Sequence, residues 1–358
     1  RMPRARSAAA LRSALLVLLL GAAPALSGCG QQQALGKANS IIVVAAADSV
    51  WQQVRDTTFS TLESRVLTVR PEKKFYVQPV DTVDKEDFLR LRTFKQVVVF
   101  GTPDNRFVRE VLDAADGTPP PPPALVHATD VWARNQSVTA VLLDPGAPVE
   151  SWRSQLGELA LHVDRRYRRF SRARMYASGP DTAAMNSIRD RFGFGLAFPA
   201  VYDVAIRGGG EGPVIIRNDN PSPADLIRSI LVDWRSPPLD SLTPARARAW
   251  RAAVDSVYYG VPQAMDTTRS RTRRLQVDGR PALEVTGVWS DEDSDYPAGG
   301  PFIDRLVQCP DRTYFLDAWI YAPGKDKYQY LVQVREIMDS FTCGAPAETP
   351  GVARTGDG

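Results

Sequence analysis

Cys29 is the residue of this chain with the most recognisable chemistry around it. It ends the string Leu26-Ser27-Gly28-Cys29, which matches the lipobox, where the cysteine thiol receives a diacylglycerol and the chain is cut before it. Four arginines without an acidic residue, and then an apolar run over 14–23, precede it, as in a secretory signal. An apolar run of about ten residues is shorter than the ~20 needed to cross a bilayer as a helix. We therefore expect residues 1–28 to be a lipoprotein signal peptide; the alternative is an ordinary signal peptide with a cysteine near its cut site.

The lipid expected on Cys29 would fix the location of the mature protein. Each buried methylene contributes roughly 0.8 kcal/mol, so two or three acyl chains, palmitate among them, would hold the protein on a membrane. Gly30, rather than Asp, follows the cysteine, which by the sorting rule of enteric bacteria directs a lipoprotein to the outer membrane. We expect an envelope protein facing the periplasm or the cell surface, with residues 29–40 as a polar tether.

Cys309 and Cys343 are the pair that remains once Cys29 is assigned to the lipid. The expected compartment is oxidising, and disulfides persist there. A bridge closing a loop of ~35 residues would stabilise the fold by a few kcal/mol. We expect a disulfide, with two buried free thiols as the alternative; the absence of CxxC spacing argues against a metal pair.

His127 and His162 are the only histidines, and they lie far apart in the sequence. Neither has the spacing of a metal-ligand pair, and no GxSxG nucleophile motif accompanies them. His162 falls within a helical pattern and is expected at the edge of the core or in solvent. We therefore predict no catalytic residue, metal or cofactor. The competing hypothesis is an envelope hydrolase of glycan, ester or peptide substrates that uses carboxylates or one histidine.

Three further clusters could bind ions. Asp291, Asp293 and Asp295 have the spacing of the first calcium-loop ligands, but Tyr296 and Phe302 stand where that loop needs Gly and Glu, so a solvated acidic loop is expected.

The glycines of 208–212 join strand to strand, which favours a hairpin loop over a phosphate cradle. An arginine-rich helix face could hold anionic lipid or phosphate, or could simply be solvated. Its members are Arg165, Arg166, Arg168, Arg169, Arg172 and Arg174.

The net charge does not indicate a nucleic-acid partner. The whole chain carries a formal +3, with 44 basic and 41 acidic side chains, but four of the arginines lie in the expected signal peptide. Without that segment the chain is nearly neutral, so the global charge does not favour binding to nucleic acid.

The hydrophobic pattern predicts an α+β protein made of two α/β sandwich-like domains. Over 41–178, strand-like runs at 41–46, 75–77, 97–100 and 138–143 alternate with helical patterns, which indicates an N-terminal α/β domain. Its last helix, from Pro148 to Phe170, carries one continuous apolar stripe. The five prolines at 119–123 predict a stiff surface loop.

The pattern over 179–343 predicts an antiparallel sheet with flanking helices. Helices are expected over 181–191 and 325–341, with strands at 302–307 and 314–321 before the second one. Asp278-Gly279 between two apolar runs predicts a tight hairpin turn. Residues 344–358 are expected to be a disordered tail.

Several strings resemble a family of uncharacterised bacterial lipoproteins that share a domain of unknown function, DUF4837. The most distinctive block comprises Trp289, Gly299-Gly300-Pro301-Phe302, Tyr321-Ala322-Pro323 and Lys327, although Tyr328 stands where a basic residue is expected. Similar strings occur at 194–202, 255–257 and 130–136. The resemblance implies an envelope lipoprotein and no activity. A fainter likeness, of pattern only, is to the PsbP-like sandwich.

The distinctive block has two interpretations. Gly299, Gly300, Pro301 and Phe302, with Trp289, Tyr321 and Lys327, could form a binding loop, or the glycines could permit a close approach at the start of an edge strand. Together these observations predict a non-catalytic binding or assembly module of the envelope, whose partner would be an envelope protein, glycan or lipid.

Overall fold

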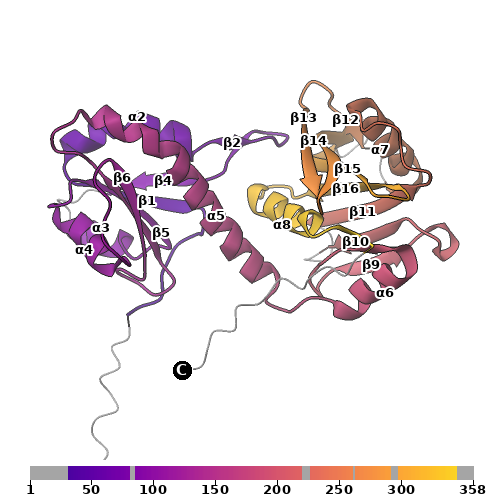
Figure 1. Cartoon of the computed structure of the whole chain (residues 1–358), viewed down its shortest axis with the longest axis horizontal. Helices are drawn as coiled ribbons and strands as arrows, with labels where there is room; N and C mark the ends of the chain where they lie inside the picture. Colours follow the sequence, from indigo (N-terminus) through magenta and orange to yellow (C-terminus); the bar gives the residue numbers. More distant parts are fainter. Residues whose placement is uncertain (1–30, 81–84, 220–225, 261–262, 292–296, 345–358) are drawn as a thin grey trace, which may run out of the picture.

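The computed structural model describes residues 31–80, 85–219, 226–260, 263–291 and 297–344 (Figure 1). The expected signal peptide, Cys29 and residues 345–358 of the expected tail therefore lie outside the described residues. Within the described part, no helix is both long and apolar enough to cross a membrane.

The N-terminal unit, β1 to α5, is built on a five-stranded sheet in the order β4-β1-β5-β7-β6. Its first four strands are parallel and β6 is antiparallel at the edge. The central strands are continuous buried runs because helices cover both faces of the sheet. The strands are β1 (Ser40–Ala45), β4 (Tyr76–Pro79), β5 (Gln96–Gly101), β6 (Ala124–Thr129) and β7 (Ser137–Leu142). The helices are α2 (Asp48–Leu62) and α5 (Leu156–Met175) on one face, and α3 (Lys85–Leu91) and α4 (Arg106–Ala114) on the other.

The C-terminal unit, α6 to β17, contains an eight-stranded antiparallel sheet in the order β12-β14-β15-β16-β11-β10-β9, with β13 also paired to β14. One face packs on α7 (Pro244–Tyr258), and the other packs on α6 (Thr182–Phe192) and α8 (Tyr328–Asp339). The strands are β9 (Asp203–Ile206), β10 (Val214–Asn218), β11 (Ile227–Arg235), β12 (Ala264–Met265), β13 (Arg271–Val277), β14 (Arg280–Asp291), β15 (Ala298–Gln308) and β16 (Thr313–Tyr321). The predicted α+β class with an antiparallel second sheet is confirmed.

Two predicted turns of the C-terminal unit are present. Asp278 and Gly279 both have positive φ, 53° and 66°, and join β13 to β14 as a tight hairpin. The glycines at 208–210 form a single 3-10 turn, η2 (Gly208–Gly210), between the antiparallel strands β9 and β10. The glycine-rich stretch is therefore a hairpin connection.

Helix α5 connects the two units. It continues from a 3-10 turn, η1 (Val149–Gln155), and its residues Leu159, Val163 and Tyr167 are buried in the N-terminal core. Its last residue, Met175, is buried in the C-terminal core. The boundary expected at 178–179 lies in the turn after α5, and the independence of each unit stays a prediction.

Residues 31–40 differ from the expected free tether. The backbone of Gln33 pairs with Arg134 and that of Leu35 with Phe94 as isolated β-bridges, and Ala34 is buried. The segment is polar in composition, but its backbone donors and acceptors find partners along the loops at the end of the sheet. The chain is therefore held against the N-terminal unit from Gln31 onward.

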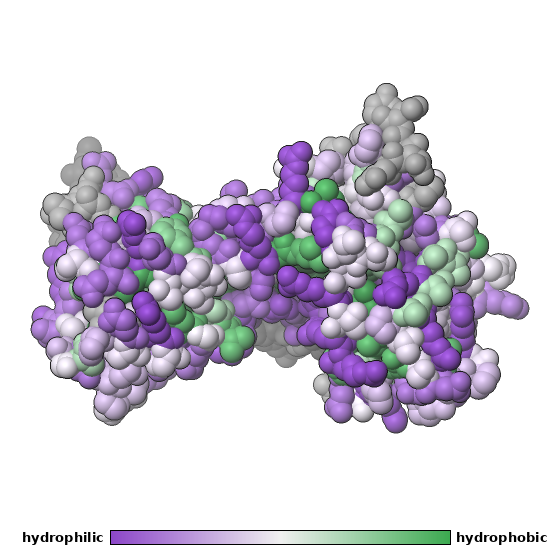
Figure 2. All heavy atoms as spheres, turned by 90° about the horizontal axis from the view of Figure 1, so that it is seen from above, coloured by the Kyte–Doolittle hydropathy of each residue, from purple (hydrophilic) through white to green (hydrophobic). Residues whose placement is uncertain are grey.

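A small hairpin reaches from the N-terminal unit to the C-terminal unit. It consists of β2 (Arg65–Val66) and β3 (Glu72–Lys73), which pair antiparallel. Glu72 accepts a hydrogen bond from the backbone of Lys327, and the Val69 carbonyl accepts one from Arg269. Hydrophilic residues predominate on the surface where the two units meet (Figure 2).

Candidate functional site

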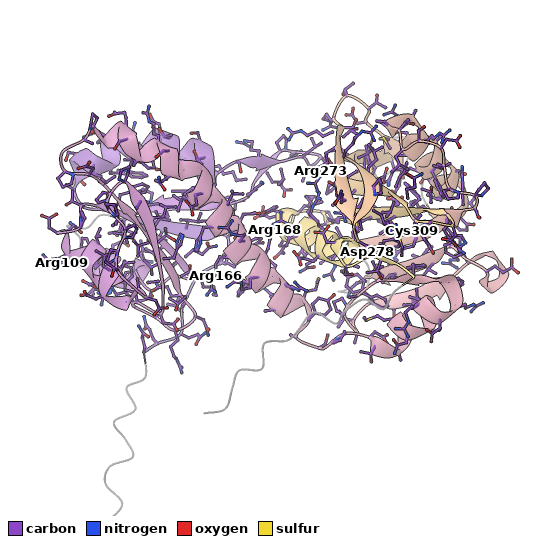
Figure 3. The ribbon with its side chains drawn as sticks, viewed as in Figure 1. Arg109, Arg166, Arg168, Arg273, Asp278 and Cys309 are labelled. Atoms are coloured by element: carbon purple, nitrogen blue, oxygen red, sulfur yellow. A yellow bond between two sulfur atoms is a disulfide. The ribbon has the colours of Figure 1, made fainter. Side chains whose placement is uncertain are left out.

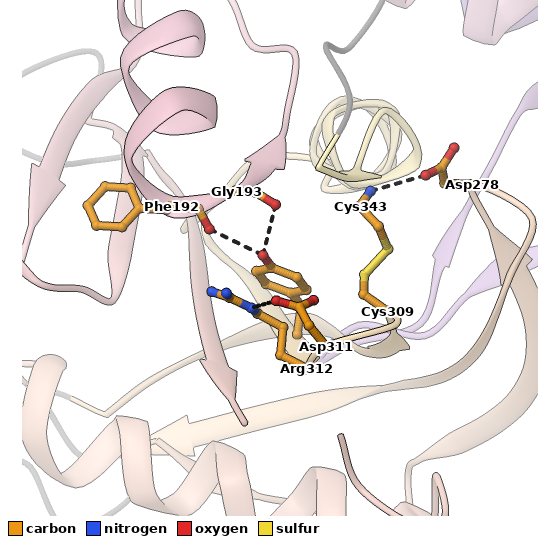
Figure 4. The surroundings of a disulfide bond; sticks show 8 residues. Phe192, Gly193, Asp278, Cys309, Asp311, Arg312 and Cys343 are labelled. Atoms are coloured by element: carbon orange, nitrogen blue, oxygen red, sulfur yellow. Dashed lines mark hydrogen bonds and ion pairs between the residues drawn. A yellow bond between two sulfur atoms is a disulfide. The ribbon is translucent and has the colours of Figure 1, made fainter. Parts of the chain in front are cut away.

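Cys309 and Cys343 form the predicted disulfide, with their Cα atoms 5.8 Å apart (Figure 4). Cys309 follows β15, and Cys343 lies in β17 (Thr342–Cys343), which pairs with β8 (Phe194–Gly195). The backbone N–H of Cys343 also donates to the Asp278 carboxylate at 3.1 Å. The bridge thus ties the last strand to the central sheet and is structural.

Gly299 to Phe302 do not form a loop, so this part of the prediction is wrong, whereas a binding role for the block stays a prediction. They lie within β15, where Gly300 is opposite Trp289 and Phe302 is opposite Trp319. Trp289 and Phe302 are each 1% exposed and belong to the core beneath α7. Gly300 is needed here because a Cβ atom would overlap the carbonyl oxygen of Ile320 on the neighbouring strand, whereas a Cβ on Gly299 would lie 3.0 Å from the carbonyl oxygen of Trp289.

The other two residues of the distinctive block lie at the edge of the fold. Tyr321 is half-buried at the end of β16, opposite Ile227. Lys327 is at the start of α8, and its Nζ is 2.9 Å from Oε1 of Glu72 on the β2–β3 hairpin. Lys327 therefore joins the two units and is not a free ligand-binding cation.

The structure brings His127 and His162 together, which the sequence did not predict. Their rings stack with centroids 3.5 Å apart and planes 2° apart. His127 lies on the edge strand β6 and its Nδ1 is 3.1 Å from Oγ1 of Thr139. The Nε2 of His162, on α5, is buried without a hydrogen-bond partner among the described residues. Only the packing of α5 against β6 creates this pair, so sequence spacing carried no signal for it.

Three arginines of the predicted basic face surround the two histidines. Arg165, Arg166 and Arg169 line a pocket of about 180 Å³ together with His127 and His162, and we call it the histidine–arginine pocket. Its other walls are Ala114, Asp116, Ala128, Thr129 and Ser137. Among the described residues, none of these three arginines makes an ion pair within 4.0 Å.

The remaining arginines of the face point elsewhere. Arg168 pairs with Asp164 at 2.7 Å, and Arg172 lies 3.9 Å from Glu336 of α8. Figure 3 shows Arg168 on the side of α5 toward α8 and Arg166 on the side toward the N-terminal sheet. Arg168 is therefore paired within α5 and Arg172 approaches α8, whereas Arg165, Arg166 and Arg169 line the pocket.

The electrostatics of the pocket favour an anion. Burial, the neighbouring His127 and the nearby arginines lower the pKa of His162 to about 4, and burial lowers the pKa of His127. Both rings are therefore neutral at pH 7, while the arginines stay charged. Guanidinium groups bind phosphate oxygens through paired N–H donors, and Thr129 and Ser137 add hydroxyl groups to the walls.

No group of three or more His, Cys, Asp or Glu side chains within the described ranges could hold a metal ion. Asp291 is buried at the end of β14, whereas Asp293 and Asp295 lie outside the described residues. The calcium interpretation of that cluster is therefore untested by the structure.

A second charged cluster lies in the core of the C-terminal unit. Arg251 of α7 reaches Asp304 and Asp317, which are opposite each other on β15 and β16, and all three are buried. Burial raises the pKa of Asp304 well above its ordinary value. The Tyr259 hydroxyl donates to Asp317 at 2.7 Å. None of these residues lines the pocket, and we assign the cluster to the stability of the fold.

This chain was compared with curated proteins, with solved structures and with protein families. No curated protein matches the chain. Among solved structures, LpqN of Mycobacterium tuberculosis, described as involved in cell envelope biogenesis, is 14% identical over 42% of this chain and 83% of its own, with a TM-score of 0.29. Cyanobacterial PsbP of Synechocystis sp. PCC 6803 is 12% identical over 42% of this chain and 86% of its own, with a TM-score of 0.30.

The sequence of the C-terminal unit also matches a family. Residues 181–340 match the model described as Domain of unknown function (DUF4837). This range begins just before α6 and ends just after α8, and it contains Trp289, Gly299–Phe302, Tyr321 and Lys327. Over residues 181–340, this chain is therefore similar to DUF4837, a domain of unknown function.

Proposed function

We propose that this protein is an envelope lipoprotein, anchored in the outer membrane through a lipid on Cys29, and that it acts as a non-catalytic binding module. Its ligand is the phosphate of an anionic lipid headgroup, held in the histidine–arginine pocket. The observation that carries the proposal is a set of three arginines, Arg165, Arg166 and Arg169, that make no ion pair with any described residue and surround two neutral histidines. Such a cluster is expected to attract an anion, because three guanidinium groups outnumber Asp116, the one carboxylate in the pocket wall.

The position of Gln31 supports a lipid headgroup, and not free phosphate, as the ligand of the pocket. The Gln31 side chain donates to the carbonyl of Asp130 at 2.7 Å, and Asp130 directly follows Thr129, which lines the pocket. Cys29 is two residues before Gln31, so an extended chain puts it at most about 7 Å away. A lipid on Cys29 would thus hold the pocket close to the headgroup layer, where polybasic surfaces gain energy from anionic lipids.

The competing function is an envelope hydrolase. The observation in its favour is the pairing of two neutral histidines in a pocket, since a neutral imidazole can act as a general base. However, the hydroxyl that contacts His127 belongs to Thr139, which is 2% exposed and unable to reach a substrate. The geometry therefore supports binding better than catalysis.

The binding proposal is tested with the mature chain carrying Cys29→Ala, so that no lipid contributes to attachment. Sedimentation with vesicles of phosphatidylcholine alone and of phosphatidylcholine with phosphatidylglycerol should show binding only to the anionic vesicles. Replacing Arg165, Arg166 and Arg169 by Gln should weaken it by about 30-fold, at ~1 kcal/mol per basic residue near the surface with partial screening. Replacing Arg106, Arg109 and Arg153 by Gln removes the same charge outside the pocket and should change binding less than about 3-fold.

Two results would overturn the proposal. Equal weakening by both triple variants would show that only net charge matters. Complete competition by inorganic phosphate at millimolar concentration, with no preference for anionic vesicles, would identify a free phosphate as the ligand. The anchor is tested separately: in cells, Cys29→Ala should leave an unprocessed or released protein, and its correct processing and membrane attachment would contradict the lipid assignment alone.

A further inference from the structure

Strand β13 has one free edge within the described part of the chain. It pairs with β14 from Arg271 opposite Thr286 to Val277 opposite Arg280, and no described strand pairs with its other side. Arg271 to Arg274 are all exposed. An edge strand presents unpaired N–H and C=O groups, which form a template for another extended chain.

The free edge borders a groove of about 760 Å³ between the two units, which we call the inter-unit groove. The β2–β3 hairpin and α5 form one wall, β13 and β14 form another, and α8 closes the third side. Just before β13, Nη1 of Arg269 donates to the Val69 carbonyl of the β2–β3 hairpin at 3.0 Å. Pro301 and Phe302, from the block that defines the family resemblance, line it as well.

The inter-unit groove has an excess of positive charge. Six basic side chains line it against three acidic ones: Arg65, Lys74, Arg168, Arg271, Arg273 and Arg335 against Asp164, Glu284 and Asp339. Glu284 is shared by Arg273, Arg335 and the buried Arg305, which lowers its pKa to about 2. The other two carboxylates are engaged as well, since Asp164 pairs with Arg168 and Asp339 pairs with Arg305.

Three cations of the groove, Arg65, Lys74 and Arg271, make no ion pair among the described residues. Arg65 donates to the Pro71 carbonyl at 2.8 Å, and Nζ of Lys74 lies 5.8 Å from the centroid of the Tyr328 ring. Since side chains alternate along a strand, Arg271 lies on the same face of β13 as Arg273, which contacts Glu284 across the strands at 2.8 Å. Arg274 lies on the opposite face. The free charge therefore sits beside the free strand edge.

We propose that the inter-unit groove binds an extended acidic peptide segment of a partner protein, which adds as a strand to the free edge of β13. Alternate carboxylates of that segment contact Arg271 and Lys74, and its backbone pairs with β13. Main-chain hydrogen bonds supply affinity in this mode, and the side chains that enter the groove supply specificity. A polyanionic glycan would satisfy the charges but not the strand edge, so the edge favours a peptide. This site is independent of the lipid anchor and of the histidine–arginine pocket.

The test uses fluorescence anisotropy with the mature Cys29→Ala chain and a labelled nine-residue peptide of alternating Glu and Thr. We expect saturable binding that is lost when every Glu is replaced by Gln. Arg271→Gln should weaken binding about 5-fold, as expected for one charged contact. Arg274→Gln is the matched control, with the same charge change on the other face of the same strand, and should change binding less than 2-fold.

Strand addition is tested by methylating the peptide amides. One peptide carries N-methyl groups on the odd-numbered residues and a second on the even-numbered residues. Since alternate amides of an edge strand point toward its partner, only one of the two peptides should lose binding. Equal binding of both methylated peptides would overturn strand addition. If polyphosphate displaced the peptide fully, and Arg274→Gln weakened binding as much as Arg271→Gln, the groove would be a general polyanion site and not a peptide site. If no saturable binding were seen at 1 mM peptide, the site would be rejected.

Discussion

Gly300 lies directly opposite Trp289 across the β14–β15 ladder, and a Cβ atom on Gly300 would overlap the carbonyl oxygen of Ile320 on β16. Three adjacent strands therefore approach each other more closely here than any side chain allows. The family block at Gly299 to Phe302 is thus explained by packing in the middle of a sheet. Its two glycines differ, because a Cβ on Gly299 would come to 3.0 Å from the Trp289 carbonyl oxygen without overlapping it.

We predict that Gly300→Ala lowers the free energy of unfolding by about 3 kcal/mol, the upper end of the usual range for overpacking with backbone displacement. Gly299→Ala should cost less, about 1 kcal/mol. The control is Gly157→Ala on α5, where a Cβ meets no atom within 4 Å; a helical alanine there should be neutral or stabilising by up to about 1 kcal/mol. Urea denaturation measures all three, and equal values for Gly300 and Gly157 would contradict the packing argument.

The buried cluster around Arg251 gives a second prediction. Arg251→Met should lower the free energy of unfolding by about 3–5 kcal/mol, because it leaves Asp304 and Asp317 buried without their cation. The two carboxylates should respond differently. Asp304 holds its proton because burial raises its pKa, so Asp304→Asn should be nearly neutral, whereas Asp317→Asn disturbs contacts to both Arg251 and Tyr259.

Chemical denaturation of the three variants decides this prediction. Asp317→Asn should be destabilised more than Asp304→Asn, by about 1–3 kcal/mol. The reverse order would contradict a protonated Asp304.

The stacked histidines predict a pH dependence of stability. The pKa of His162 is about 4 in the folded protein and about 6.5 in the unfolded chain. The unfolded state therefore takes up a proton as the pH falls below 6.5, while the folded state resists protonation until about pH 4. The contribution of His162 to the free energy of unfolding is fully present above pH 6.5 and is lost as the pH falls from 6.5 to about 4. The loss is less than about 2 kcal/mol, because the ring is partly exposed.

This dependence is measured by urea denaturation at pH 7 and pH 5. His162→Gln should lose less stability between these two pH values than the unmodified chain does. Acidic groups such as Glu284 contribute equally in both proteins and cancel in the comparison. An unchanged pH dependence in the variant would refute the role of His162.

The disulfide predicts a loss of stability of about 3 kcal/mol when Cys309 and Cys343 are both replaced by Ala, since the bridge closes a loop of 34 residues. Thermal unfolding with and without a thiol reductant measures it. The reductant should lower the Tm of the unmodified chain and leave that of the double variant unchanged. A reductant effect of the same size on both proteins would show that the bridge does not constrain the fold.

The sequence predicted most elements of the fold because strong local patterns set them. The buried run at 41–46, the Asp278-Gly279 turn and the stripe of α5 each depend on near neighbours, and each element is present. The segment 31–40 was misjudged because polar composition says nothing about backbone pairing. Its partners, Phe94 and Arg134, are about 60 to 100 residues away in the chain, a separation that local reasoning does not reach.

The candidate sites could be predicted only in part. The arginine face of α5 was visible as a run of charges, but which arginines are paired depends on α8 and β6. The His127–His162 contact and the Arg251 cluster arise from strand order and helix packing, and no spacing rule encodes them. The glycines at 299 and 300 were noticed, yet their place in a sheet interior required the register of three strands.

The continuity of α5 sets the width of the inter-unit groove. The helix runs unbroken from Leu156 to Met175, and the ring of Tyr167 on it stacks on Tyr328 at the start of α8, with centroids 5.3 Å apart. Because both ends of α5 are buried and this contact lies near its middle, the helix holds the two sheets at a fixed separation. A peptide would therefore bind in a groove of constant width, and selectivity would depend on the fit of the peptide to the groove and not on closure of the two units around it.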